Sequence, residues 1–215
     1  VDQDTMGLSP IAVRNWLEAN AIQREGGAYN RATGARISAC VPMHTFGMPA
    51  RIRALVEVCE EFGIPVVEDA AESLGSFVGD THTGRFGKLG VISFNGNKIV
   101  TTGGGGMIIT DDLELAKRAK HLSTTAKKPH AWEYDHDETG YNYRMPNLNA
   151  ALGVAQVERL PAMLEIKAEL AAAYASFCED AGIEFVAAPA GTRPNYWLNA
   201  ILLSSLEERN EFLAA

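Results

Sequence analysis

The sequence has few cysteines, and they follow no ligand spacing. Cys40, Cys59 and Cys178 are far apart, odd in number and never part of a C-x-x-C pair. A zinc cage or a disulfide framework needs closely spaced or paired cysteines, so both are disfavoured and a reducing compartment is favoured. We therefore expect a cytoplasmic protein whose three thiols fill space in the core.

Basic clusters and long apolar runs are also absent. The 19 Lys and Arg residues are outnumbered by 27 Asp and Glu residues, which gives a formal charge of −8. A nucleic-acid-binding protein normally shows a basic patch, so that class is disfavoured. The longest apolar runs fall far short of the roughly 18 residues needed to cross a bilayer. We expect neither nucleic acid nor membrane among the partners.

The N-terminus shows neither an initiating Met nor the basic-then-apolar layout of a signal peptide. The C-terminal residues read as a helix that has no closing cap. We therefore expect the chain to be a piece of a longer protein.

Four consecutive glycines at 103–106 suggest a phosphate loop, but the two common patterns fail. A G-x-G-x-x-G fingerprint that starts at Gly103 has Ile108 in its last position, and a strand pattern follows where a helix is required. The Walker pattern around Gly87 lacks its first glycine and its final Ser or Thr. The glycines are predicted to form a tight turn with close backbone packing.

The histidines do not suggest a metal site. His130 and His136 are six residues apart in a polar segment, a spacing that suits no helix face. His136 and Glu138 form H-x-E, but no P-C-x-x-C follows to complete a deaminase site. We expect no metal.

Strand and helix patterns alternate through about residue 125. Helical periodicity is seen at 9–23, 48–63 and 111–122, and apolar strand patterns at 35–43, 64–72, 90–94 and 106–110. This order implies an α/β fold whose sheet is mostly parallel and covered on both faces.

The second half of the chain has a different character. Residues 123–147 are polar, aromatic and poorly periodic, and a loop of that length is usually functional or packed against a partner. A helical pattern at 148–182, interrupted at Pro161, leads to short strand patterns. We divide the chain into a large domain, 1–155, and a second part, 156–215, with connecting helices and the start of a smaller α+β domain.

Two charged residues stand where charge is costly. Asp69 closes an apolar strand pattern, at the carboxyl end where ligands bind in open α/β sheets; alternatively it caps a following helix. Lys98 has no charged neighbour within nine positions on either side. Most lysines are simply exposed, but a desolvated lysine is a nucleophile toward aldehydes. An Asp and a Lys so placed are the two groups that pyridoxal phosphate needs.

Four linked motifs strengthen this interpretation: "VEDAAESLGS", "ISFNGNK", "TTGGGGMIITDD" and "GYNYRMPNLNAALGVAQVERL". Together they resemble the DegT/DnrJ/StrS family of pyridoxal-phosphate sugar aminotransferases, over nearly the whole chain. "HLSTTAKKPH" and "HDETGYNYRMPNLNAALG" further resemble the subgroup that makes precursors of legionaminic-type bacterial surface sugars. The resemblance implies the large domain of the aspartate-aminotransferase-like fold, which is pyridoxal-phosphate fold type I.

The resemblance also implies roles for individual residues. Lys98 would form the Schiff base with the cofactor and move a proton to and from the substrate carbon. Asp69 would pair with the ring nitrogen and Ser93 would bind the phosphate. Asn95, one of the neutral hydrogen-bonding residues before Lys98, is a further candidate cofactor-binding residue. Glu72 departs from the family, which commonly has Gln or His there, and an acid beside the ring hydroxyl must be protonated or otherwise satisfied.

Three further residues follow from the same resemblance. Asn142 would reach the phosphate of the cofactor in a partner subunit, which implies a homodimer whose interface the long polar loop crosses. His44 and Tyr143 would contact the substrate. The family's small-residue phosphate loop and its ring-stacking aromatic have no counterpart in this sequence.

The implied reaction moves an amino group from glutamate to a nucleotide-linked 4-keto-6-deoxy sugar for a bacterial surface glycan. A 3-keto sugar is an alternative acceptor. A sister dehydratase activity is disfavoured because it usually accompanies loss of the lysine. A non-catalytic subunit of the same fold is disfavoured by the retained Asp69, Ser93 and Lys98.

Overall fold

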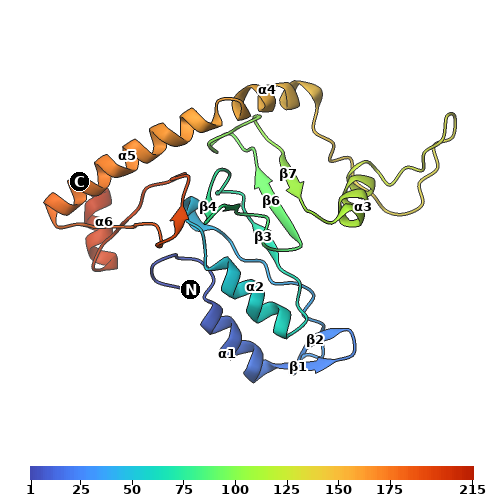
Figure 1. Ribbon diagram of the computed structural model, residues 1–215, viewed down its shortest axis with the longest axis horizontal. Coiled ribbons are helices and arrows are strands. Elements are labelled where there is room, and N and C mark those ends of the chain that lie inside the picture. The colour runs from blue at the N-terminus through green and yellow to red at the C-terminus, as the bar shows by residue number, and fades with distance from the viewer.

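A three-stranded sheet lies at the middle of the computed structural model, which describes residues 1–215 (Figure 1). The strands β3 (Val67–Asp69), β6 (Leu89–Ser93) and β7 (Gly106–Ile109) follow each other in that order. β3 and β6 are parallel, whereas β6 and β7 are antiparallel. The sheet is therefore mixed rather than mostly parallel. The chain returns from β6 to β7 without the crossover helix that a parallel pair requires.

The strand predicted at 35–43 is an extended segment that forms only isolated bridges: Cys40 and Met43 bridge to the β3 segment in parallel, and Arg36 bridges to Tyr29 antiparallel. The Cys40 N–H donates to the Pro65 carbonyl, and the Asp69 N–H donates to the Pro42 carbonyl, both at 2.9 Å. Pro42 has no N–H to donate in return, so the ladder is interrupted there.

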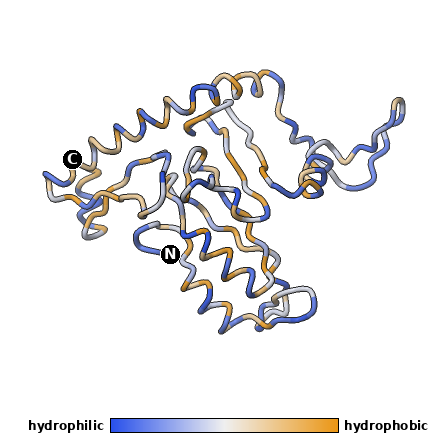
Figure 2. The backbone as a smooth tube through the Cα atoms, in the orientation of Figure 1, coloured by the Kyte–Doolittle hydropathy of each residue, from blue (hydrophilic) through white to orange (hydrophobic).

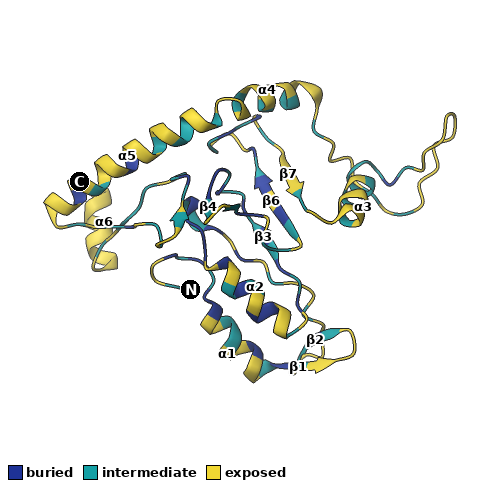
Figure 3. Ribbon diagram, in the orientation of Figure 1, coloured by how far each residue is buried: buried dark blue, intermediate teal, exposed yellow.

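Two of the predicted helices cover this part of the sheet. α1 (Pro10–Asn20) begins at Ser9, whose hydroxyl accepts from the backbone of the first turn, and α2 (Ile52–Glu61) ends before Gly63, which has φ +65°. They share one apolar core with the residues that lead into β3, including Leu17, Leu55 and Ile64 (Figure 3). Burial of each such side chain contributes about 1.5–3 kcal/mol.

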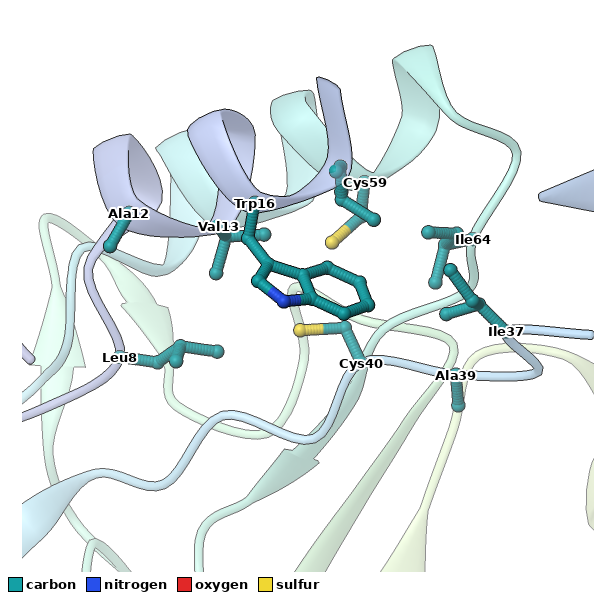
Figure 4. Close-up of a pocket in the computed structure, with 10 residues that line it drawn as sticks. Leu8, Ala12, Val13, Trp16, Ile37, Ala39, Cys40, Cys59 and Ile64 are labelled. Carbon is teal, nitrogen blue, oxygen red and sulfur yellow. The ribbon is translucent and has the colours of Figure 1, made fainter. Parts of the chain in front are cut away.

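An apolar cavity of about 300 Å³ lies between α1, α2 and the extended segment (Figure 4). All ten residues that line it are hydrophobic, among them Trp16, Cys40 and Cys59. Ligand sites need a few placed polar groups to orient what they bind, and this cavity offers almost none. The cysteines are unpaired.

A hairpin that the sequence analysis did not predict follows α1. β1 (Ala21–Arg24) pairs antiparallel with β2 (Gly27–Asn30), so the first helix ends earlier than its predicted limit at residue 23. Glu25 and Gly26 form the turn, and Gly26 and the first residue of β2, Gly27, adopt φ +89° and +133°, a conformation that favours glycine.

The other predicted helices are present. α3 (Leu113–Ser123) begins at Asp112, whose carboxylate accepts from two backbone N–H groups, and α4 (Asn147–Val157) is followed by α5 (Leu160–Ala181). Between α3 and α4, residues 124–146 form a projecting arm, which is mostly hydrophilic (Figures 1 and 2).

Short elements complete the chain. The 3-10 turn η1 (Thr45–Gly47) precedes α2, and a second small sheet holds β4 (Phe77–Val78), β5 (Thr81–His82) and β9 (Thr192–Arg193). β8 (Glu184–Phe185) pairs with β10 (Ile201–Leu202), and α6 (Leu206–Ala214) ends the chain. None of the helices has the length and apolar character that a membrane crossing requires. The division into two domains stays a prediction.

Candidate functional site

Lys98 lies in the turn that follows β6, where its N–H donates to the Asn95 carbonyl at 3.1 Å. Its side chain is only 14% exposed, and its Nζ lies 3.8 Å from Glu72 Oε1. The lysine is therefore a largely desolvated cation with one carboxylate partner, as the uncharged sequence around it suggested.

Glu72 is held by a second contact from the opposite side. Its Oε2 accepts from the Phe46 N–H at 2.8 Å. Phe46 adopts φ +59°, ψ 14° inside η1, a left-handed conformation that side chains other than glycine rarely adopt. The acid that departs from the expected Gln or His thus has both a cation and a backbone donor as partners.

Asp69 and Ser93 stand at the same edge of the sheet, because β3 and β6 are parallel and both end there. Asp69 Oδ1 accepts from the Ala71 N–H at 3.1 Å, which closes a turn rather than the helix considered above. Ser93 Oγ accepts from the Asn95 N–H at 3.2 Å. The edge therefore presents a carboxylate, a hydroxyl and an amide within two adjacent turns.

The glycine run behaves as predicted, as a tight turn with close packing. Gly103 and Gly105 adopt φ +79° and +92°. A Cβ on Gly106 would lie 2.5 Å from the Ile92 carbonyl oxygen, closer than any side chain could approach. The glycines therefore let β7 pair closely with β6 behind Lys98.

Glu68, one residue before Asp69, is fully buried and points to the opposite face of β3. Its two oxygens accept from the backbone N–H groups of Gly84 at 2.7 Å, Phe86 at 2.6 Å and Gly87 at 2.7 Å, and contact His44 at 3.1 Å. Burial alone would raise the pKa of Glu68, but the hydrogen bonds from His44, Gly87 and Gly84 lower it below its ordinary value. This carboxylate fixes the loop between β5 and β6 to β3.

His44 has no polar atom left for a substrate, which corrects the expected substrate contact. Its side chain is completely buried, and its Nδ1 accepts from the Ala50 N–H at 3.1 Å. The proton is therefore on Nε2, which donates to Glu68. His44 therefore has a structural role: it links Glu68 of β3 to the backbone at Ala50.

Trp197 and Asn195 were not among the predicted site residues. The Trp197 ring lies over Lys98, with Nζ 3.7 Å from the ring centroid, and Asn195 is a buried residue hydrogen-bonded to the Glu72 carbonyl at 2.8 Å. Both lie about 100 positions from Lys98 in the chain, and no local pattern marks them. Glu68 carried a signal, since an acid inside an apolar strand pattern requires a buried partner.

Asn142 and Tyr143 are exposed on the arm and are not brought to Lys98 within this chain. Tyr143 is 75% exposed and stacks on Tyr141, with ring centroids 5.1 Å apart. Their expected roles at the cofactor and the substrate therefore stay predictions.

One group on α3 and the arm has potential cation ligands close together. Ligand atoms of His121, Asp137 and Glu138 lie within 4.8 Å of one another. However, Arg118 pairs with Glu138 through both of its terminal nitrogens, so this carboxylate already has a cation. The expectation of no metal stays a prediction.

Comparisons with known proteins agree with the resemblance. The model of the "DegT/DnrJ/EryC1/StrS aminotransferase family" matches residues 1–215. The chain is 34% identical to EpsN of Bacillus subtilis over 205 residues, which is 95% of this chain and 50% of EpsN. It is 33% identical to the GDP-perosamine synthase of Vibrio cholerae over 190 residues, 87% of this chain and 51% of that protein.

The fold is likewise that of a solved relative. A Brucella abortus aminotransferase described with the same family names superposes with a TM-score of 0.84 at 22% identity, and covers all of this chain and 54% of that one. This confirms the predicted fold class. The chain spans about half the length of the relatives that it matches.

Proposed function

Because this chain belongs to the DegT/DnrJ/EryC1/StrS aminotransferase family, we propose that it carries the lysine-bearing half of a pyridoxal-phosphate-dependent aminotransferase that acts on nucleotide-linked sugars. The observation that carries the proposal is Lys98, desolvated and 3.8 Å from Glu72, at the sheet edge where Asp69 and Ser93 also lie. The retained lysine favours a transferase over a non-catalytic subunit.

The groups at this edge fit the cofactor. Asp69 is suited to pair with the protonated ring nitrogen, and the Ser93 hydroxyl with Asn95 is suited to bind the phosphate. Both strand ends face one edge, so these groups can act on one bound molecule. When bound, pyridoxal phosphate withdraws electrons from the carbon that loses or gains a proton.

Lys98 supplies the amine that binds the cofactor aldehyde and then holds the transferred proton at Nζ. Glu72 stabilises the ammonium that results, since Phe46 keeps one carboxylate oxygen fixed while the other faces Nζ. The acid thereby performs an electrostatic role that Gln or His would perform less strongly.

The acceptor is proposed to be a 4-keto-6-deoxy sugar on a nucleotide, with glutamate as the donor and with the product used in a bacterial surface glycan. A relative named GDP-perosamine synthase supports a nucleotide-linked sugar. A 3-keto sugar remains the alternative acceptor. The reaction is placed in the cytoplasm, in line with the unpaired cysteines.

A panel of nucleotide-linked keto sugars tests the acceptor. Incubation of the full-length protein with pyridoxal phosphate, glutamate and each sugar should convert 4-keto-6-deoxy sugars to amino sugars, as read by product mass. Conversion of 3-keto sugars alone would replace the proposed acceptor, and no conversion of any sugar would contradict the proposed function.

The protein is further proposed to act as a homodimer in which the arm of one subunit brings Asn142 to the other subunit's cofactor. The arm projects from the body and carries exposed aromatic residues, including Trp132 at 86% and Tyr134 at 80% exposure (Figure 1). α4 next to it exposes Leu148 at 87%. Exposed apolar groups of this extent usually mark an interface.

Subunit mixing tests the shared site. Lys98→Ala and Asn142→Ala variants are each expected to be impaired, but a mixed dimer contains one site with both native residues. A mixed dimer should therefore have up to about half of the activity of a wild-type dimer, because one of its two independent sites is intact. Absence of any restoration in verified mixed dimers would contradict a site shared between subunits.

A further inference from the structure

The indole of Trp197 is in direct contact with the proposed catalytic amine. Lys98 Nζ lies 3.7 Å from the ring centroid, and the Trp197 Nε1–H donates to the Asn97 carbonyl at 2.8 Å. That hydrogen bond fixes the plane of the ring beside the lysine. A cation this close to the face of an indole is stabilised by the ring quadrupole.

Trp197 is held in place by Asn195, whose side chain makes three hydrogen bonds to the backbone. Asn195 Nδ2 donates to the carbonyls of Glu72 at 2.8 Å and Leu74 at 2.9 Å, while Oδ1 accepts from the Trp197 N–H at 2.9 Å. A Cβ on Gly47 would lie 1.8 Å from Asn195 Oδ1, so the 3-10 turn makes room for this amide only with glycine. Asn195 thus binds residues 195–198, called the C-terminal segment below, to the turn after β3.

Two further bonds fix the same segment from other sides. The Leu198 N–H donates to the Phe46 carbonyl at 3.3 Å, and Lys167 Nζ on α5 donates to the Trp197 carbonyl at 3.0 Å. Phe46 also holds Glu72, the carboxylate that faces Lys98. Lys98 therefore lies between a fixed carboxylate and a fixed aromatic face.

We propose that Trp197, held by Asn195, is a positioning residue that directs the Lys98 amine and stabilises its ammonium form. This proposal rests on the proposed function for its role in turnover, but the contact itself exists before any cofactor binds. In each reaction cycle Lys98 takes a proton from the substrate carbon and returns it, and the indole face favours the form that carries it. The C-terminal segment consequently belongs to the site, although it lies far from Lys98 in the sequence.

Amine labelling of the cofactor-free protein tests the contact independently of activity. Trp197→Leu should raise the rate at which acetic anhydride labels Lys98 by about tenfold, because the covering ring and its attraction for the cation are lost. Trp197→Phe, which keeps an aromatic face, should raise the rate much less. Peptide mass spectrometry measures the rate, with exposed Lys117 as the internal reference. Equal labelling of Lys98 in all three proteins would overturn the proposal.

Steady-state kinetics test the role in turnover. Trp197→Leu should lower kcat about tenfold with less than about a twofold change in the KM for the sugar, and Trp197→Phe should recover most of the loss. Trp16→Phe, in the apolar cavity, is the matched control and should keep wild-type kcat. Equal losses in the Leu and Phe variants with matching falls in Tm would show a structural role and overturn the proposal.

The two proposals fail in different ways. Borohydride treatment of the wild-type protein with pyridoxal phosphate should fix the cofactor on Lys98. If it does not, the proposed function fails, whatever the labelling of the cofactor-free variants shows. If it does, and the Trp197 variants label and turn over like wild type, only the role of Trp197 fails.

Discussion

Lys98→Ala is expected to lower aminotransferase activity by at least about 10³-fold, because no other group can serve as both nucleophile and proton carrier at this position. Lys98 is the amine that faces Glu72 at this sheet edge, and it is only 14% exposed. Pyridoxal phosphate mixed with the variant should leave no reduced cofactor on the 98 position after borohydride treatment. Activity with the sugar panel and peptide mass give the two measurements.

Two further lysine variants show whether charge or nucleophilicity is lost. Lys98→Arg keeps a cation opposite Glu72 and Trp197 but cannot form the bond to the aldehyde, so it should be as inactive as the Ala variant. Lys117→Ala, at an exposed position on α3, should behave as wild type. Wild-type turnover by either Lys98 variant would remove Lys98 from the mechanism.

The placement of Asp69 at a strand end and of Lys98 in a largely buried turn could be predicted from the sequence because both depend on local context. An acid at the end of an apolar strand pattern, and a lysine in an uncharged stretch, are each costly without a partner. The α1, α2 and α3 helices were predictable for the same reason: their caps and apolar spacing are encoded within one segment.

The features that the sequence analysis missed depend on contacts between distant segments. β7 is antiparallel because the chain reverses at the glycines, and its apolar composition is equally typical of a parallel strand. His44 was expected to face the substrate, but Ala50 and Glu68 engage both ring nitrogens. Trp197 lies beside Lys98 because distant contacts hold its segment there, among them the bond from Asn195 to the turn after β3.

The neighbouring acids Glu68 and Asp69 show how a strand separates two functions. Successive side chains on a strand point to opposite faces, so Asp69 can face the site while Glu68 enters the interior. The interior acid fixes His44 and three backbone N–H groups that belong to the loop before β6. The site residues therefore stand on a framework whose own polar groups are satisfied.

Loss of the Glu68 carboxylate is expected to be the most destabilising single change in the chain. Glu68→Ala leaves three backbone donors and the His44 N–H without an acceptor, and loss of one partner of a buried charged network costs about 3–5 kcal/mol. Glu68→Gln keeps one oxygen acceptor and should cost less. Urea unfolding of the full-length protein, followed by circular dichroism, measures the free energy of unfolding of both variants. The matched control is Glu61→Gln, which removes one charge of an exposed salt bridge with Arg14 and should change stability little.

The pH dependence of stability gives the same residue a second test. The folded protein holds the pKa of Glu68 below its ordinary value of about 4.3, so its contribution to stability is fully present above that pH. The contribution is lost as pH falls through the lowered pKa of the folded state, because protonation then removes the charge that four donors share. Wild type should therefore lose more stability than Glu68→Gln between neutral pH and acid, and the difference between their free energies of unfolding should stop changing once the pH is below the lowered pKa of Glu68. Parallel loss of stability in both proteins across this range would show that folding does not lower the pKa of Glu68.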